Sequence, residues 1–246
     1  MKPRTESLIR LLAVQAAWTY ERMSGIGVGH AAAPLLRDLY ATSSAEERRA
    51  AVARSAEFFN SHPYLAGVAV GAVVRAERDG VPGPAIVRLR TALSGPLGAL
   101  GDQLIWAGEV PVLIGLALAT VSWLGIWAVL LVVLVHNVFR LWLTAWGLDV
   151  GLREGLGVGA ALQRSWLPGA AAQAQSAAAF AVGLAIPIVA WRLLSGAEEG
   201  VIVGVVGGML VGTALALSHL TRERVTGLRF GLVLLVVALV IVGGFR

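Results

Sequence analysis

Residues 93–106 read Leu-Ser-Gly-Pro-Leu-Gly-Ala-Leu-Gly-Asp-Gln-Leu-Ile-Trp, and this stretch decides how the rest of the chain is interpreted. Glycine and proline residues and one carboxylate, that of Asp102, interrupt what then becomes a long apolar run. A bilayer provides no water for exposed backbone groups, so irregular backbone at membrane depth is tolerated only where it packs in protein or lines a cavity. A carboxylate at that depth indicates a functional site. We therefore expect this segment to place polar groups inside a membrane protein.

The composition also indicates an integral membrane protein. Of 246 residues, 57% are hydrophobic and 14% are charged, whereas about a quarter of residues are charged in soluble domains. The formal net charge of +5 could suggest nucleic acid as a partner, but the arginines are scattered along the chain rather than gathered into one basic stripe. The charge is therefore better explained by orientation in a lipid bilayer than by nucleic-acid binding. Because the chain has no cysteine, disulfides and thiolate chemistry are excluded.

The hydrophobic pattern predicts an all-α, polytopic membrane protein. We expect amphipathic cytoplasmic or interfacial helices in residues 1–63, re-entrant hairpin segments in 64–120 and a transmembrane helix bundle in 121–246, all within one integrated membrane domain. Twenty helical residues extend about 30 Å, which is one hydrocarbon thickness. On this basis we predict about four spans: Val121–Trp146, Ala177–Leu194, Val201–Leu220 and the shorter Leu228–Val242.

The N-terminal part has helical periodicity without a full span. From Leu8 to Leu39, apolar residues recur at helical spacing, and Gly25, Gly27 and Gly29 are expected to break the pattern. The apolar segment Leu65–Val74 is only ten residues long, about half of what a span needs. It is therefore expected to dip into the membrane or to form a packed hairpin arm.

A capping signal marks one further helix. Ser44 and Glu47 have the spacing of a capping box, which predicts a helix from Ala45 to Phe59. The helix is expected to stop before Pro63, because the residue that precedes a proline is pushed out of the α region.

The distribution of basic residues predicts the orientation of the chain. Basic residues are denser before Arg90 than after it, and the short link 195–200 has no lysine or arginine. Under the positive-inside rule the N-terminus is cytoplasmic, and that link is external.

The carboxylates of the interrupted segment form the first candidate site. Asp102 and Glu109 are seven residues apart, so both lie on one face if the segment is helical. With Gln103 and Trp106 they could bind a sugar, because carboxylates and amides bond hydroxyl groups and an indole covers an apolar ring face. Alternatively, Asp102 caps the helix that follows the glycine-rich turn.

Other polar residues are candidates for binding or for structure. Asn60 and His62 can both bond a polyol, although they could equally be the polar end of a helix. Asn137 and Arg140 share a helical face beside His136, and a structural pairing of Arg140 with an acid or with backbone carbonyls is the first expectation. The four histidines are too scattered to predict a metal site, and no catalytic nucleophile or cofactor is indicated.

Several short motifs, in order along the chain, resemble those of one known family. That family is the IID membrane component of the mannose/fructose/sorbose class of the phosphoenolpyruvate-dependent sugar phosphotransferase system. The similar segments are Tyr20–Met23, Phe58–Tyr64, Gly95–Asp102 with Trp106 and Pro111, and the set Asn137, Arg140, Gly147, Gly151 and Gly155.

The resemblance implies a bacterial cytoplasmic-membrane permease subunit that forms a hetero-oligomer with a second membrane subunit, IIC. Together the two subunits would move a hexose or amino sugar inward, while the cytoplasmic carriers IIA and IIB deliver the phosphate. By motif position, Asn60, His62 and Asp102 would lie near the sugar, and Trp106 would help to shape the re-entrant turn. Glu109, Asn137 and Arg140 would have structural or coupling roles.

Two other interpretations remain open from the sequence. The chain could be a non-transporting membrane platform that docks or regulates IIA and IIB. Val110, which stands where the family usually has an arginine, and the short 195–200 link favour that alternative. An unrelated helical carrier would require the ordered motif matches to be coincidental.

Overall fold

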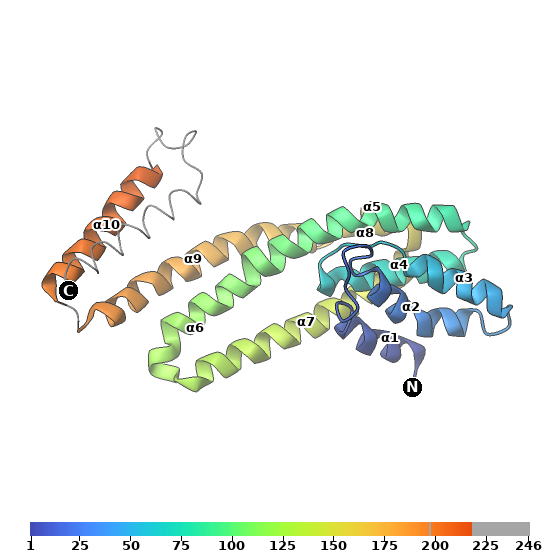
Figure 1. Cartoon of the computed structure of the whole chain (residues 1–246), viewed down its shortest axis with the longest axis horizontal. Helices are drawn as coiled ribbons and strands as arrows, with labels where there is room; N and C mark the ends of the chain where they lie inside the picture. The colour runs from blue at the N-terminus through green and yellow to red at the C-terminus, as the bar shows by residue number, and fades with distance from the viewer. Residues whose placement is uncertain (197, 218–246) are drawn as a thin grey trace. The chain divides into compact units, whose positions relative to one another are not determined.

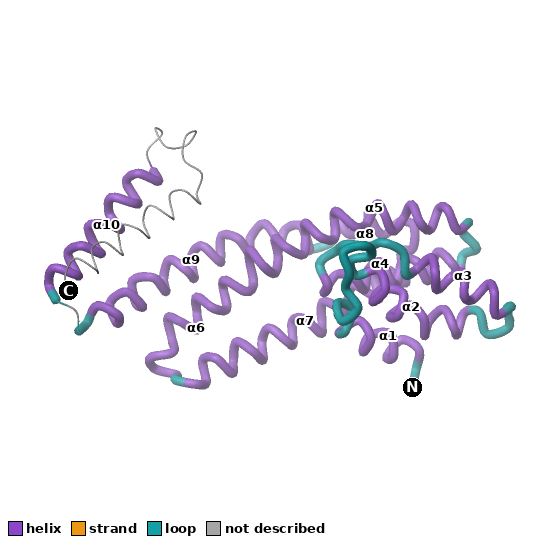
Figure 2. Tube along the Cα trace, in the orientation of Figure 1, coloured by secondary structure: helices purple, strands orange, loops and turns teal. Residues whose placement is uncertain are grey.

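The computed structural model describes residues 1–196 and 198–217. In that part the chain is built of helices and connecting loops and contains no β-strand (Figures 1 and 2). It forms two compact units, residues 1–185 and the part that begins at Ile186. The helices are α1 (Pro3–Leu12), α2 (Gly25–Leu39), α3 (Ala45–Ser55), the 3-10 turn η1 (Pro63–Leu65), α4 (Ala66–Arg78), α5 (Gly83–Gly101), the π-helix η2 (Asp102–Glu109), α6 (Val110–Leu124), α7 (Ile126–Glu154), the 3-10 turn η3 (Gly155–Gly157), α8 (Val158–Arg164), α9 (Leu167–Leu194) and α10 (Glu199–Leu217).

The predicted capping box is present at the start of α3. The Ser44 hydroxyl accepts from the Glu47 backbone N–H at 3.1 Å, and the Glu47 carboxylate accepts from the Ser44 N–H at 2.9 Å. The predicted end at Phe59 is wrong, because α3 stops at Ser55.

The chain leaves the helix early because distant partners hold the next residues. The fully buried Phe59 accepts hydrogen bonds at its carbonyl from the N–H and the hydroxyl of Ser24, at 3.0 and 2.8 Å. The buried Arg90 donates to the carbonyls of Arg54 and Glu57 at 2.8 and 3.0 Å, and so it caps the end of α3. These contacts draw residues 57–62 into a loop that lies between α2 and α5.

The glycines of α2 do not break the helix, contrary to the sequence expectation. A Cβ atom on Gly27 would lie 2.9 Å from the Cα of Val14, and one on Gly29 would lie 2.9 Å from the Cα of Ala56. Such distances are too short for a side chain. The glycines therefore allow backbone segments to pack directly against α2.

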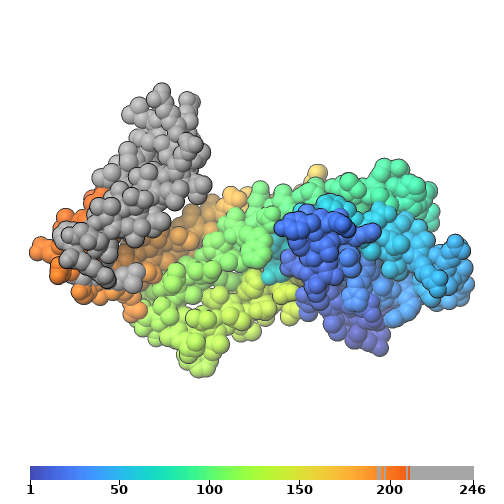
Figure 3. Space-filling view, viewed as in Figure 1, coloured from blue at the N-terminus to red at the C-terminus, as the bar shows by residue number. Residues whose placement is uncertain are grey.

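Helices α4 and α7 form the core of the first unit. Nearly every residue of α4 is buried, so the apolar segment that begins at Leu65 is a packed arm rather than a dip into lipid. Gly67 and Gly71 on α4 face Gly147 and Gly151 on α7, and their backbones approach closely. This is the small-residue packing that is common between membrane helices, and the first unit gathers around it. Figure 3 shows the N-terminal residues, α3 and α5 on one surface of this unit.

The interrupted segment is helical throughout. Gly95, Pro96 and Gly98 lie within α5, and the helix then widens into the π-helix η2 before it continues as α6. The glycine and proline residues were expected to interrupt the backbone here, but the irregularity is a change of helix type rather than a break. A π-helical bulge inside an α-helix is rare and is often found at a functional site.

The predicted first span Val121–Trp146 is also wrong. Gly125, at φ +56°, ends α6 and reverses the chain, so that α6 and α7 form a hairpin with its turn at this glycine (Figure 1). Among the described residues, two stretches are long and apolar enough to cross a membrane, Gly83–Leu124 and Ile126–Arg192. Large apolar side chains, including Trp123, Trp127 and Leu134, are exposed on the hairpin, as expected of a surface that faces lipid or another subunit.

The remaining predicted spans correspond to α9 and α10. The span Ala177–Leu194 lies within the longer α9, and Val201–Leu220 overlaps α10 as far as Leu217. The shorter span Leu228–Val242 lies outside the described residues. The predicted division of the chain at residues 63 and 120 stays a prediction.

Candidate functional site

An open hollow lies on the surface of η2. It is lined by Asp102, Gln103, Trp106 and Ala107 and has a volume of about 640 Å³; we call it the η2 hollow. The Trp106 side chain is 54% exposed, and within the described part of the chain the Asp102 carboxylate has no hydrogen-bond partner. Asp102 has helical φ and ψ angles and makes no capping bond, so the capping alternative is wrong. The hollow presents an unpaired carboxylate, an amide and an indole wall to a ligand.

His62 lies directly behind the hollow. It is 2% exposed, and its ring centroid is 5.5 Å from that of Trp106. Nδ1 accepts from the Tyr64 backbone N–H at 3.3 Å, whereas Nε2 is buried and has no hydrogen-bond partner among the described residues. Burial lowers the pKa of His62 to about 4, so the ring is neutral at physiological pH. In the neutral ring the proton is therefore on Nε2.

The close approach of His62 requires Gly101, the last residue of α5. A Cβ atom on Gly101 would overlap the Cβ and Cγ atoms of His62. Any side chain at position 101 would displace the imidazole from the start of η2. The glycine of the Gly-Asp motif therefore makes room for the histidine.

A hydrogen-bonded chain of three side chains lies at the other end of η2. The Glu109 carboxylate oxygens are 3.0 and 3.1 Å from Nδ1 of His136 on α7. Nε2 of His136 is 2.9 Å from the hydroxyl of Tyr64, which lies in η1. Arg140 stacks over the Tyr64 ring at 5.1 Å and donates to the Leu12 carbonyl at 2.8 Å, which is the backbone pairing expected for this arginine.

The structure separates the two carboxylates that the sequence placed on one face. Asp102 lines the η2 hollow, whereas Glu109 is turned toward His136. The reason is that a π-helix has a wider turn than an α-helix, so a spacing of seven residues no longer returns to the same face.

Neither Asn60 nor Asn137 is among the residues that line the hollow. The Asn60 backbone exchanges hydrogen bonds with the Ser94 hydroxyl, which ties the loop to α5, and its side chain is exposed. Asn137 donates to the Val133 carbonyl at 2.8 Å within α7.

Sequence reasoning did not assign a role to Tyr64 or His136. The available signals were the His-Pro-Tyr run at 62–64 and the His-Asn pair at 136–137. Neither signal shows that the two residues meet. Within the described residues no group of three or more histidine, cysteine or acidic side chains could hold a metal ion.

Apolar helices of membrane-crossing length and a polar hollow on a π-bulge define an all-α membrane protein with a candidate ligand site. Residues 1–190 match the family described as the PTS system mannose/fructose/sorbose family IID component. The chain belongs to this family, and the resemblance stated from the motifs is confirmed.

Curated relatives agree with this assignment. The mannose-specific EIID component of Escherichia coli K12 is 29% identical over 149 residues, which cover 58% of this chain and 52% of the relative. The sorbose-specific EIID component of Klebsiella pneumoniae is 30% identical over 149 residues, covering 58% and 54%. The fructose permease IID component of Bacillus subtilis is 28% identical over 145 residues, covering 57% and 52%. The matched part of the chain thus spans about half the length of these relatives.

Two solved structures share the fold. A chain in the cryo-electron-microscopy structure of the mannose transporter ManYZ with microcin E492 matches with a TM-score of 0.58 at 21% identity. A structure described as that of a membrane protein matches with a TM-score of 0.71, also at 21% identity. Each match covers 99% of this chain and 95% of the other chain.

Proposed function

We propose that this chain is the IID subunit of a mannose-class permease in a bacterial cytoplasmic membrane, with its N-terminus cytoplasmic. Together with a IIC subunit it translocates a hexose or amino sugar, and the soluble carriers IIA and IIB phosphorylate that sugar. The N-terminal density of basic residues supports the orientation. The exposed apolar surface of the α6–α7 hairpin supports assembly with lipid and a second membrane subunit.

The η2 hollow is the observation that carries the proposal. A sugar presents hydroxyl groups around its ring and a weakly polar ring face. The Asp102 carboxylate and the Gln103 amide can bond hydroxyls, while the exposed Trp106 indole can cover the ring face. A hollow of about 640 Å³ is large enough for a monosaccharide.

Two further residues can contribute to this site. The unpartnered Nε2–H of His62 lies in a ring packed beside Trp106, and a buried donor without an acceptor costs about 1–3 kcal/mol. A small movement of Trp106 on ligand binding would open this donor to a sugar hydroxyl. Asn60, in the same loop as His62, does not line the hollow itself, but its side-chain amide is exposed.

The test is phosphoenolpyruvate-dependent phosphorylation of labelled hexoses and amino sugars by membranes that contain this chain, IIC, IIA and IIB. We expect sugar phosphate that disappears when this chain is omitted. Asp102→Asn should leave membrane insertion intact and lower the rate about tenfold or more, because a hydrogen bond to a charged group contributes about 1.5–3 kcal/mol. Asp38→Asn, at an exposed aspartate of α2, is the matched control and should retain the wild-type rate. Wild-type activity in Asp102→Asn would refute the site.

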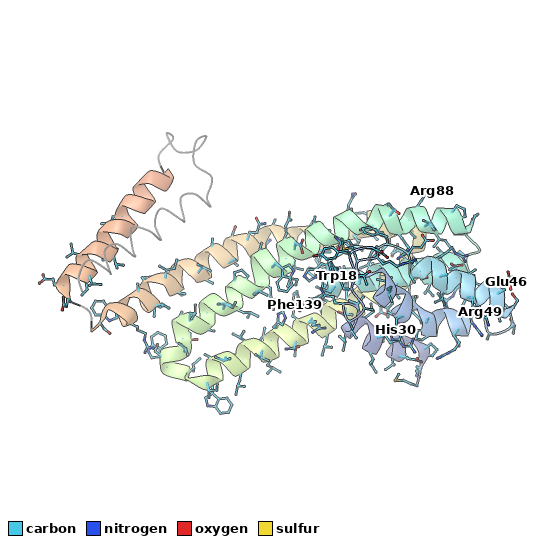
Figure 4. All side chains as sticks on the ribbon, viewed as in Figure 1. Trp18, His30, Glu46, Arg49, Arg88 and Phe139 are labelled. Carbon is cyan, nitrogen blue, oxygen red and sulfur yellow. The ribbon has the colours of Figure 1, made fainter. Side chains whose placement is uncertain are left out.

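A second candidate function is a membrane platform that docks or regulates the soluble carriers. It is favoured by a groove of about 490 Å³ between α2 and α3, whose apolar floor is bordered by Arg37, Arg48 and Arg49. Arg49 and Glu46 project from the exposed side of α3 (Figure 4). The platform is the better interpretation if the assembled complex yields no sugar phosphate and Arg48→Gln with Arg49→Gln weakens binding of a carrier.

A further inference from the structure

The hydrogen-bonded chain of Glu109, His136 and Tyr64 ties together three segments that are distant in the sequence. Tyr64 and His136 are 72 residues apart, and His136 and Glu109 are 27 apart. The side chains of Glu109 and His136 are only 14% and 24% exposed. Removal of one member would leave partly buried polar atoms without partners, which is costly.

The donor and acceptor groups of the three side chains determine the direction of their hydrogen bonds. A carboxylate can only accept, so Nδ1 of His136 carries the proton that is donated to Glu109. In the neutral ring Nε2 is then an acceptor, and the Tyr64 hydroxyl donates a hydrogen bond to it. For a neutral His136, Glu109 therefore selects the tautomer in which Nε2 accepts from Tyr64.

The three hydrogen-bonded side chains and the neighbouring His62 ring contact η2 at both ends. At the C-terminal end of η2, Glu109 is bonded to His136. At the N-terminal end, Gly101 lies directly against His62, and the rings of His62 and Tyr64 meet edge to face at 4.9 Å. The same cluster therefore contacts the first and the last turn of η2, a helix type that is rare in proteins.

We propose that Tyr64, His136 and Glu109 are positioning residues that keep η2 in its π-helical form and so set the arrangement of Asp102 and Trp106 in the η2 hollow. The effect on sugar affinity rests on the proposed function, whereas the effect on η2 does not. Without these hydrogen bonds, η2 loses its wider π-helical turn and approaches α-helical geometry. The side chains of the hollow then rotate relative to the rest of the unit.

The absence of cysteine from the chain makes the state of η2 measurable. Ile105 is fully buried on η2 and Ala107 is exposed on it, so Ile105→Cys should react slowly with a maleimide and Ala107→Cys rapidly. These single-cysteine proteins are labelled in membranes that contain the assembled complex. Adding Tyr64→Phe, which removes only the hydroxyl, should raise the labelling rate at Ile105→Cys severalfold.

The matched control is Tyr40→Phe. Tyr40, like Tyr64, has its hydroxyl bonded to a side chain, here the Glu77 carboxylate at 2.7 Å, but it lies at the C-cap of α2, away from η2. It should leave labelling at Ile105→Cys unchanged. If Tyr64→Phe fails to insert, Glu109→Gln, which keeps the shape and removes the charge, should show the same direction of change.

Sugar kinetics provide the second readout. Tyr64→Phe should raise KM about three- to tenfold, as expected for one lost hydrogen bond, and leave the maximal rate within about twofold. Unchanged labelling in both Tyr64→Phe and Glu109→Gln, or an equal change in Tyr40→Phe, would overturn the positioning role. If labelling changes but the wild-type complex neither binds nor phosphorylates a sugar, the positioning role stands and the proposed function fails.

Discussion

The contact between α4 and α7 leads to a prediction at Gly151. In Gly151→Ala, the new Cβ would lie 2.6 Å from the backbone nitrogen of Ala72 and 2.9 Å from the Cα of Gly71, and it would be still closer to the carbonyl oxygen of Val68. All of these are backbone atoms of α4, which cannot move one by one. The two helices must separate along the core of the unit.

The change in the free energy of unfolding of Gly151→Ala is the balance of two opposing effects. Overpacking of a core by one methyl group costs typically 1–3 kcal/mol, and a site closed by backbone lies at the upper end. Replacement of a helical glycine by alanine returns about 1 kcal/mol. We expect a net loss of about 2 kcal/mol in the free energy of unfolding and a Tm lower by roughly 4–8 °C.

The assay is thermal unfolding of the assembled complex, followed by tryptophan fluorescence. Gly159→Ala on α8 is the matched control, because its Cβ would meet no atom within 4 Å. This substitution gains the higher helix propensity of alanine over glycine without a steric clash, so its Tm should equal or exceed that of wild type. A Tm for Gly151→Ala at or above the wild-type value would refute the backbone-to-backbone packing of α4 and α7.

Three other predictions concern local features. Ser44→Ala removes the capping box and should cost about 1 kcal/mol, seen as faster amide exchange at the start of α3. Arg90→Met leaves the carbonyls of Arg54 and Glu57 without donors, so exchange and proteolysis should increase at residues 54–59 while neighbouring α5 remains protected. Burial lowers the pKa of His62 from 6.5 to about 4, so the unfolded chain takes up the proton first. The free energy of unfolding should therefore fall as the pH drops from 6.5 to about 4, by up to about 3 kcal/mol. His62→Gln should remove this slope, which a pH series of unfolding measurements would show.

Features that depend on neighbouring residues were predictable from the sequence. The capping box needs only Ser44 and Glu47, three positions apart, and the structure confirms it. The all-α membrane class follows from the low charge and long apolar runs, and the motifs indicated the family. The pairing of Arg140 with a backbone carbonyl, one of the two partners expected for it, was also correct, because a guanidinium on an apolar helix needs acceptors wherever they are.

Features that depend on distant contacts were not predictable. The end of α3 depends on Ser24 and Arg90, and the glycines of α2 matter only because the backbones of Val14 and Ala56 lie against them. The turn at Gly125 lies within an apolar run that resembles one span. Local propensity says little in such places, because tertiary contacts determine the conformation.

The same distinction holds at the candidate site. The sequence by itself determined that a carboxylate, an amide and an indole follow a glycine-rich segment in a membrane protein, because residue type and hydrophobic pattern are local properties. Only the tertiary structure decided that Asp102 and Trp106 share a hollow while Glu109 turns to His136, and that Tyr64 joins them. The physical reason is the π-helix η2. Its wider turn is set by packing at Gly101 and by a hydrogen bond from α7, and both of these contacts come from parts of the chain far from the motif.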